Sequence, residues 1–136
     1  MTGNDKKAKK KILIVDDNSD LLHSVIFSLQ RLDLKKEKEF LRAESGKECL
    51  KIVEKQKPDL ILLDIMMPKM DGWQVATKIK ENKKWRDIPI IFLTAKRDKM
   101  SIETGSASAV DYVCKPFDAE DLMKRIDKAI KQSKKK

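Results

Sequence analysis

The stretch from Pro58 to Val75 constrains the fold of this chain more than any other part of the sequence. Its apolar run, Leu60 to Leu63, has no polar alternation, which is typical of a strand buried on both faces of a parallel sheet. The run ends at Asp64, and the Asp71-Gly72 pair then marks a turn before apolar residues return at helical spacing. The sequence therefore predicts that Asp64 lies between a strand and a helix, at the sheet edge where open α/β folds bind ligands.

Other parts of the chain show the same alternation of short apolar runs and helical periodicity. The segment after the first run has an apolar stripe at 3.6-residue spacing, with Asn18 or Ser19 as its N-cap. For residues 96–109 the sequence predicts only a short or mobile helix, because charged and small residues dominate there. Five strands alternating with five helices predict a parallel sheet covered on both faces. The other four predicted strands are Ile12–Val15, a weaker one at Phe40–Leu41, Ile90–Leu93 and Val110–Cys114.

The net charge of +9 makes a nucleic-acid-binding protein worth considering. However, residues 1–11 carry five lysines and one aspartate and residues 131–136 carry four lysines, which leaves residues 12–130 at only +1. Basic residues gathered at two ends are typical of solvated tails. We expect a basic disordered leader at 1–10, a folded domain at 11–132 and a basic tail at 133–136. Nucleic acid is therefore an unlikely partner, and binding through the tails stays a less favoured alternative.

The length and the cysteines fit an ordinary intracellular domain. The 136 residues suffice for one domain with a conventional core. Cys49 and Cys114 stand 65 positions apart and match no zinc spacing, so we expect free thiols. No apolar run approaches the roughly 18 residues of a membrane span. We expect a cytoplasmic protein without a membrane partner.

Polar residues follow four of the five apolar runs. A lone aspartate at such a position more often caps or solvates a loop, but right-handed crossovers would bring all these residues to one sheet edge. Carboxylates brought close repel one another unless a cation neutralises them, and their hard oxygens suit Mg²⁺. A lysine and a hydroxyl would hold a further anion, as phosphoryl transfer to a carboxylate requires. The residues are Asp16, Asp17, Asp64, Thr94 and Lys115. Neither GxxxxGK[ST] nor GxGxxG occurs, so the phosphoryl donor is not ATP bound by this chain.

The segments VDDN, LLDIMMPKMDG, FLTA and DYVCKPF, in this order and spacing, resemble the receiver domain of two-component response regulators. The resemblance covers residues 11–132 and is to the stand-alone, chemotaxis-type members. It implies a flavodoxin-like α/β fold, a doubly wound (βα)5 parallel sheet with strand order 2-1-3-4-5. It also implies a cis peptide bond before Pro116.

The resemblance assigns roles to the residues at the sheet edge. Asp64 would accept a phosphoryl group from a phosphohistidine of a sensor histidine kinase or phosphotransfer protein. Mg²⁺ would be held by Asp16, Asp17, Asp64 and the backbone carbonyl of Met66. Lys115 would contact the phosphoryl group. The protein would then be a phosphoacceptor that assists its own phosphorylation and dephosphorylation, rather than an enzyme.

The resemblance also implies a switch. Thr94 would contact the phosphoryl group, and Tyr112 would rotate inward when that group arrives. The face built by the fourth helix, the fifth strand and the last helix would then change its downstream protein partner. Before the last strand this chain reads GSASAVDY where family members commonly read GLxxGADDY, which leaves room for a remodelled fourth-helix region.

Two alternatives to a stand-alone switch remain. A stand-alone switch would act through a bound partner. The first alternative is that the chain is a receiver fragment of a longer regulator that has an output domain. A phosphatase with an aspartyl nucleophile is less favoured, because Asp64-Ile65-Met66 does not form the DxD signature usual for such enzymes.

Overall fold

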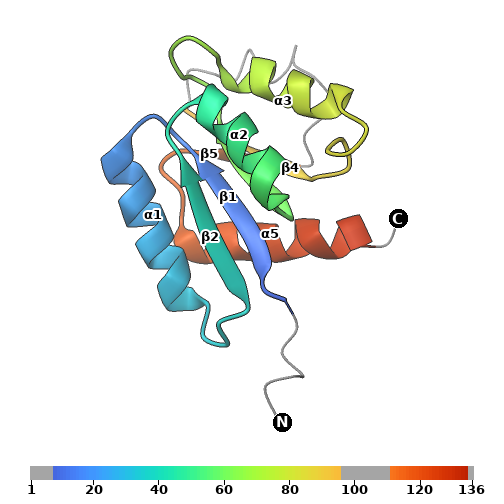
Figure 1. The fold of residues 1–136 in the computed structure, drawn as a ribbon. Helices are drawn as coiled ribbons and strands as arrows, with labels where there is room; N and C mark the ends of the chain where they lie inside the picture. Colours follow the sequence, from blue (N-terminus) through green and yellow to red (C-terminus); the bar gives the residue numbers. More distant parts are fainter. Residues whose placement is uncertain (1–7, 96–110, 135–136) are drawn as a thin grey trace.

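The computed structural model describes residues 8–95 and 111–134, which form a five-stranded parallel sheet with helices on both faces (Figure 1). The strand order is β2-β1-β3-β4-β5, so the predicted flavodoxin-like fold and its strand order are confirmed. The helix predicted between residues 96 and 109 lies outside the described residues. The described elements are β1 (Lys10–Val15), α1 (Ser19–Leu32), β2 (Lys38–Ala43), α2 (Gly46–Gln56), β3 (Leu60–Asp64), α3 (Gly72–Glu81), β4 (Ile90–Thr94), β5 (Asp111–Cys114) and α5 (Ala119–Lys134).

The two faces of the sheet carry two separate cores. Helices α1 and α5 cover one face, and α2 and α3 cover the other (Figure 1). Successive side chains of β3 alternate between them: Leu60 and Leu62 pack with α1 and α5, whereas Ile61 and Leu63 pack with α2 and α3. Every residue of β3 and β4 is buried, which explains why these strands have apolar runs without alternation.

Strand β2 lies at the edge of the sheet. Its first five residues are half-buried or exposed, and only Ala43 at its end is buried. The strand forms because its backbone pairs with all six residues of β1, from Lys10 opposite Lys38 to Val15 opposite Ala43. An edge strand needs fewer apolar residues than a central one, so its sequence signal is weak.

Two boundaries differ from those expected. Strand β1 begins at Lys10, two residues before the predicted strand Ile12–Val15, because the Lys10 N–H donates to the Glu37 carbonyl (3.0 Å) and pairing with β2 follows. Helix α5 continues to Lys134, beyond residue 132 where the family resemblance ends, because an established helix adds one hydrogen bond for each further residue. Lysine is not apolar, so the sequence pattern does not predict either boundary.

The two cysteines are free, as predicted. Cys49 is buried in α2, and burial raises the pKa of its thiol to about 12, whereas Cys114 is exposed at the end of β5. Among the helices within 8–95 and 111–134, none is both long enough and apolar enough to span a bilayer.

Candidate functional site

Three carboxylates meet at the carboxyl edge of the sheet. Val15 and Leu63 are register partners in β1 and β3, so the residues that follow them, Asp16 and Asp64, lie side by side. One oxygen from each of Asp16, Asp17 and Asp64 lies within 4.8 Å of the other two. Asp16 and Asp64 are only 2% and 5% exposed, whereas Asp17 faces solvent. The structure thus brings the predicted acidic residues together, with one open side.

Lys115 crosses the sheet edge to reach this cluster. It follows β5, which is separated from β3 by β4, and its long side chain spans that distance. The Lys115 Nζ donates to Asp16 Oδ2 (2.8 Å) and to Asp64 Oδ1 (3.2 Å). Burial alone would lower the pKa of Lys115, but the hydrogen bond to Asp16 and the charges of both carboxylates outweigh it and raise that pKa. The lysine is therefore a fixed cation. The Lys115–Pro116 peptide bond is cis, as the resemblance implied.

The electrostatics of the cluster single out Asp64. Burial and the neighbouring Asp16 raise the pKa of Asp64 from 3.8 to about 6, against the lowering effect of Lys115, and Asp17 adds a smaller increase. One ammonium group does not balance three carboxylates. The hard oxygens at this open side are the ligands that Mg²⁺ prefers, so the donor set fits that ion.

The remaining predicted site residues lie around this centre. Thr94 ends β4 and is 1% exposed, and its Oγ1 donates to the Ala95 carbonyl (3.0 Å). Met66 lies two residues beyond Asp64 and is 55% exposed. Tyr112 is half-buried in β5 and stacks on the ring of Phe92. Thr94 and Tyr112 therefore lie on β4 and β5, the two strands that follow β3 in the order of the sheet.

Two further residues support the site but were not predicted to do so. The Asn18 N–H donates to Asp16 Oδ1 (2.9 Å), while the Asn18 side chain caps α1 by accepting from the Leu21 N–H. The Gly72 N–H donates to the Ile65 carbonyl (2.8 Å), which holds the start of α3 against the loop after Asp64. Asn18 lies in the VDDN segment and Gly72 in the MDG segment, but their supporting roles are visible only in these hydrogen bonds.

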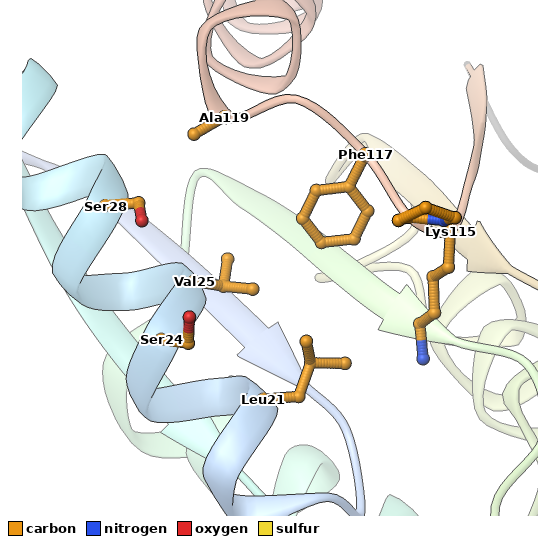
Figure 2. A pocket seen from close by; sticks show the side chains of 8 residues that line it. Leu21, Ser24, Val25, Ser28, Lys115, Phe117 and Ala119 are labelled. Atoms are coloured by element: carbon orange, nitrogen blue, oxygen red, sulfur yellow. The ribbon is translucent and has the colours of Figure 1, made fainter.

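A pocket opens beside the cluster, between α1 and the segment that joins β5 to α5. Figure 2 shows the Phe117 ring and the Leu21 and Val25 side chains turned toward the same space, with Lys115 at its margin. Ser24 and Ser28 line the side that belongs to α1. The surface next to the carboxylate cluster is thus mainly apolar, with a few hydroxyls.

These features are those of a receiver domain of a response regulator. That family matches the sequence over residues 12–127, and the chain belongs to it. A similar solved structure is the CheY-like response regulator receiver domain protein from Methanospirillum hungatei JF-1. Its sequence is 29% identical and its TM-score is 0.75, over 93% of this chain and 98% of that one. Members of this family act in two-component signalling rather than as ordinary enzymes.

Curated relatives place the chain among regulators about twice its length. The alkaline phosphatase synthesis transcriptional regulatory protein PhoP from Bacillus subtilis is 35% identical over 125 residues, which are 91% of this chain and 50% of PhoP. The probable transcriptional regulator ycf27 from Galdieria sulphuraria is 40% identical over 121 residues, 88% of this chain and 45% of ycf27. The chain thus spans about half the length of these relatives.

Proposed function

We propose that this chain is a phosphorylation switch in which Asp64 accepts a phosphoryl group from the phosphohistidine of a sensor kinase or phosphotransfer protein. The observation that carries the proposal is the Lys115 ammonium, which bridges Asp16 and Asp64 at one sheet edge. The Lys115 ammonium is a fixed cation next to Asp64, and the open side of the carboxylate cluster has room for a second, divalent cation. A nucleophile between two cations is what phosphoryl transfer to a carboxylate requires.

Each side chain has a role in this transfer. An Asp64 oxygen forms a bond to phosphorus while the bond from phosphorus to the histidine nitrogen breaks and its electron pair stays on that nitrogen. Asp64 attacks as the carboxylate, and Lys115 beside it favours this ionised form. The Lys115 ammonium then pairs with a phosphoryl oxygen instead of Asp64 Oδ1. Thr94 Oγ1 turns its proton from the Ala95 carbonyl to another phosphoryl oxygen.

The metal ion would be Mg²⁺, held by Asp16, Asp17, Asp64 and the backbone carbonyl of Met66. When bound, it neutralises the charge that develops on the transferred group. The chain contributes the preformed pair of buried carboxylates, Asp16 and Asp64, and the exposed Asp17.

The output of the switch would be a change of protein partner. Movement of Thr94 toward the phosphoryl group would let Tyr112 repack, which would alter the face of β5, α5 and the predicted fourth helix. Because the curated relatives are transcriptional regulators about twice as long, a receiver piece of a longer regulator is the second candidate beside a stand-alone switch. The free Cys49 and Cys114 support action in the reducing cytoplasm.

Asp64→Asn should abolish phosphorylation. Incubation with acetyl phosphate and Mg²⁺, followed by intact-mass measurement, should show one phosphoryl group on the parent and none on the variant, because the amide is not a nucleophile. Asp20→Asn, which changes an exposed aspartate in the first turn of α1, is the matched control and should be labelled like the parent. Undiminished labelling of Asp64→Asn would falsify the assignment.

Mg²⁺ should stabilise the unphosphorylated protein through Asp17. An ion that binds only the folded state adds about 1.4 kcal/mol at ten times its dissociation constant, so the melting temperature should rise with Mg²⁺ concentration. Asp17→Ala should remove this response, and because the side chain is exposed, the variant should still fold. Asp20→Ala should keep it. A melting temperature that still rises with Mg²⁺ in Asp17→Ala would place the ion elsewhere.

A further inference from the structure

Three aromatic rings form a cluster in which two are stacked and the third is tilted against both. Trp73 of α3, Phe92 of β4 and Tyr112 of β5 come from three elements on the same face of the sheet. The ring centroids of Trp73 and Phe92 are 4.6 Å apart, those of Phe92 and Tyr112 are 5.7 Å apart, and those of Trp73 and Tyr112 are 6.5 Å apart. All three distances lie in the range of attractive ring pairs. Tyr112, the predicted switch residue, therefore packs against both Phe92 and Trp73.

Trp73 is tied to Asp64 through the backbone. It follows Gly72, whose N–H donates to the Ile65 carbonyl (2.8 Å), and a Cβ on Gly72 would lie 2.4 Å from the Asp64 carbonyl oxygen. A capping box holds this first turn of α3: the Asp71 side chain accepts from the Gln74 N–H, and the Gln74 side chain accepts from the Asp71 N–H. The backbone that carries Trp73 is therefore held in place against the backbone around Asp64.

Tyr112 is also tied to the hydroxyl side of the site. Phe92 and Thr94 are two residues apart in β4, so their side chains share a face, and Phe92 is the register partner of Tyr112. The Tyr112 ring thus lies beside the strand that carries Thr94. Two connections from the site, through Trp73 and through β4, meet at this one ring.

We propose that Trp73 is a positioning residue for Tyr112, whose indole holds the Tyr112 ring against Phe92 in the resting state. The inference rests on the proposed function, since it states what opposes the rotation of Tyr112 when Asp64 is phosphorylated. Removing the indole should change the ratio of resting to rotated Tyr112 about fivefold, the effect expected from the loss of one or two aromatic pairs. Phosphorylation would then change the population of rotated Tyr112 by less than it does in the parent.

The test uses the fact that Tyr112 is the sole tyrosine of the chain. Protein made with 3-fluorotyrosine gives one ¹⁹F signal, which reports this ring alone. Spectra are recorded before and after labelling with acetyl phosphate and Mg²⁺, and intact mass gives the phosphorylated fraction. The variants are Trp73→Leu, which removes the ring, Trp73→Phe, which keeps one, and Trp85→Leu as the matched control. Trp85 packs on the same core, after α3.

In the parent, the ¹⁹F signal should shift in proportion to the phosphorylated fraction. In Trp73→Leu, the signal of the unphosphorylated protein should move toward that of the phosphorylated parent, as an about fivefold change in the ratio of the two orientations requires, and the shift per phosphorylated molecule should be smaller than in the parent. Trp73→Phe should recover most of the response. A purely structural role would lower the melting temperature of Trp73→Leu and Trp85→Leu alike while leaving the response per phosphorylated molecule unchanged, and that result overturns the inference. A parent that takes up no phosphoryl group overturns the proposed function instead.

Discussion

Gly72→Ala should destabilise the protein by about 2 kcal/mol, because overpacking of a tight site typically costs about 1–3 kcal/mol. The added Cβ would lie 2.4 Å from the Asp64 carbonyl oxygen and 2.8 Å from the Ile65 Cα. Both neighbours are backbone atoms of β3 and the loop after it, which cannot rotate away as a side chain does. Either α3 or the backbone of Asp64 must move, and the hydrogen bond from the Gly72 N–H to Ile65 weakens. Urea unfolding measures the loss.

Gly46→Ala provides the matched control for this prediction. Gly46 is the first residue of α2 as Gly72 is of α3, so the gain in helix propensity from alanine is similar at the two sites. A Cβ on Gly46 would meet side-chain atoms, Val75 Cγ2 at 2.8 Å and the Met70 Cβ and Sδ at 3.0 Å. Side chains adjust more easily than backbone, so the loss should be smaller. The explanation fails if both variants lose the same stability.

Asp64→Asn should stabilise the metal-free protein at neutral pH by up to about 3 kcal/mol, since each unit between pKa values is worth about 1.36 kcal/mol. Burial and the charge of Asp16 raise the pKa of Asp64 from 3.8 to about 6. Below about pH 4 this carboxyl is protonated in both the folded and unfolded states and has no effect. As the pH rises toward 6, the unfolded chain releases the proton first, so the folded state loses stability. The amide has no proton to release.

Urea unfolding between pH 4 and 7.5, with a chelator present, measures this dependence. The parent should lose stability between about pH 4 and 6 relative to Asp64→Asn, and the two curves should run in parallel above that range. Asp17→Asn is the control: Asp17 is the smallest of the causes that raise the pKa of Asp64, so most of the slope should remain. Parent and Asp64→Asn curves of the same slope would show that Asp64 titrates normally.

The sequence by itself determined the buried strands and the residues at their ends. The strands whose apolar runs end at Leu63 and Leu93 could be predicted without tertiary information, because a strand covered on both faces must be apolar throughout. It also identified Asp16, Asp64 and Lys115, since the carboxyl ends of parallel strands share one edge whatever the details of packing. The family resemblance added the strand order.

Only the tertiary structure decided how these residues meet. Lys115 is 99 positions from Asp16 and 51 from Asp64, and its two hydrogen bonds depend on strand register and on the position of β5 beside β4. The same holds for the contact between Gly72 and the backbone of Asp64. Periodicity in a sequence records which face of an element is buried, because burial selects for apolar side chains. It does not record which distant side chain lies opposite, because many pairings bury the same area while only one brings a given ammonium within 3.2 Å of a carboxylate.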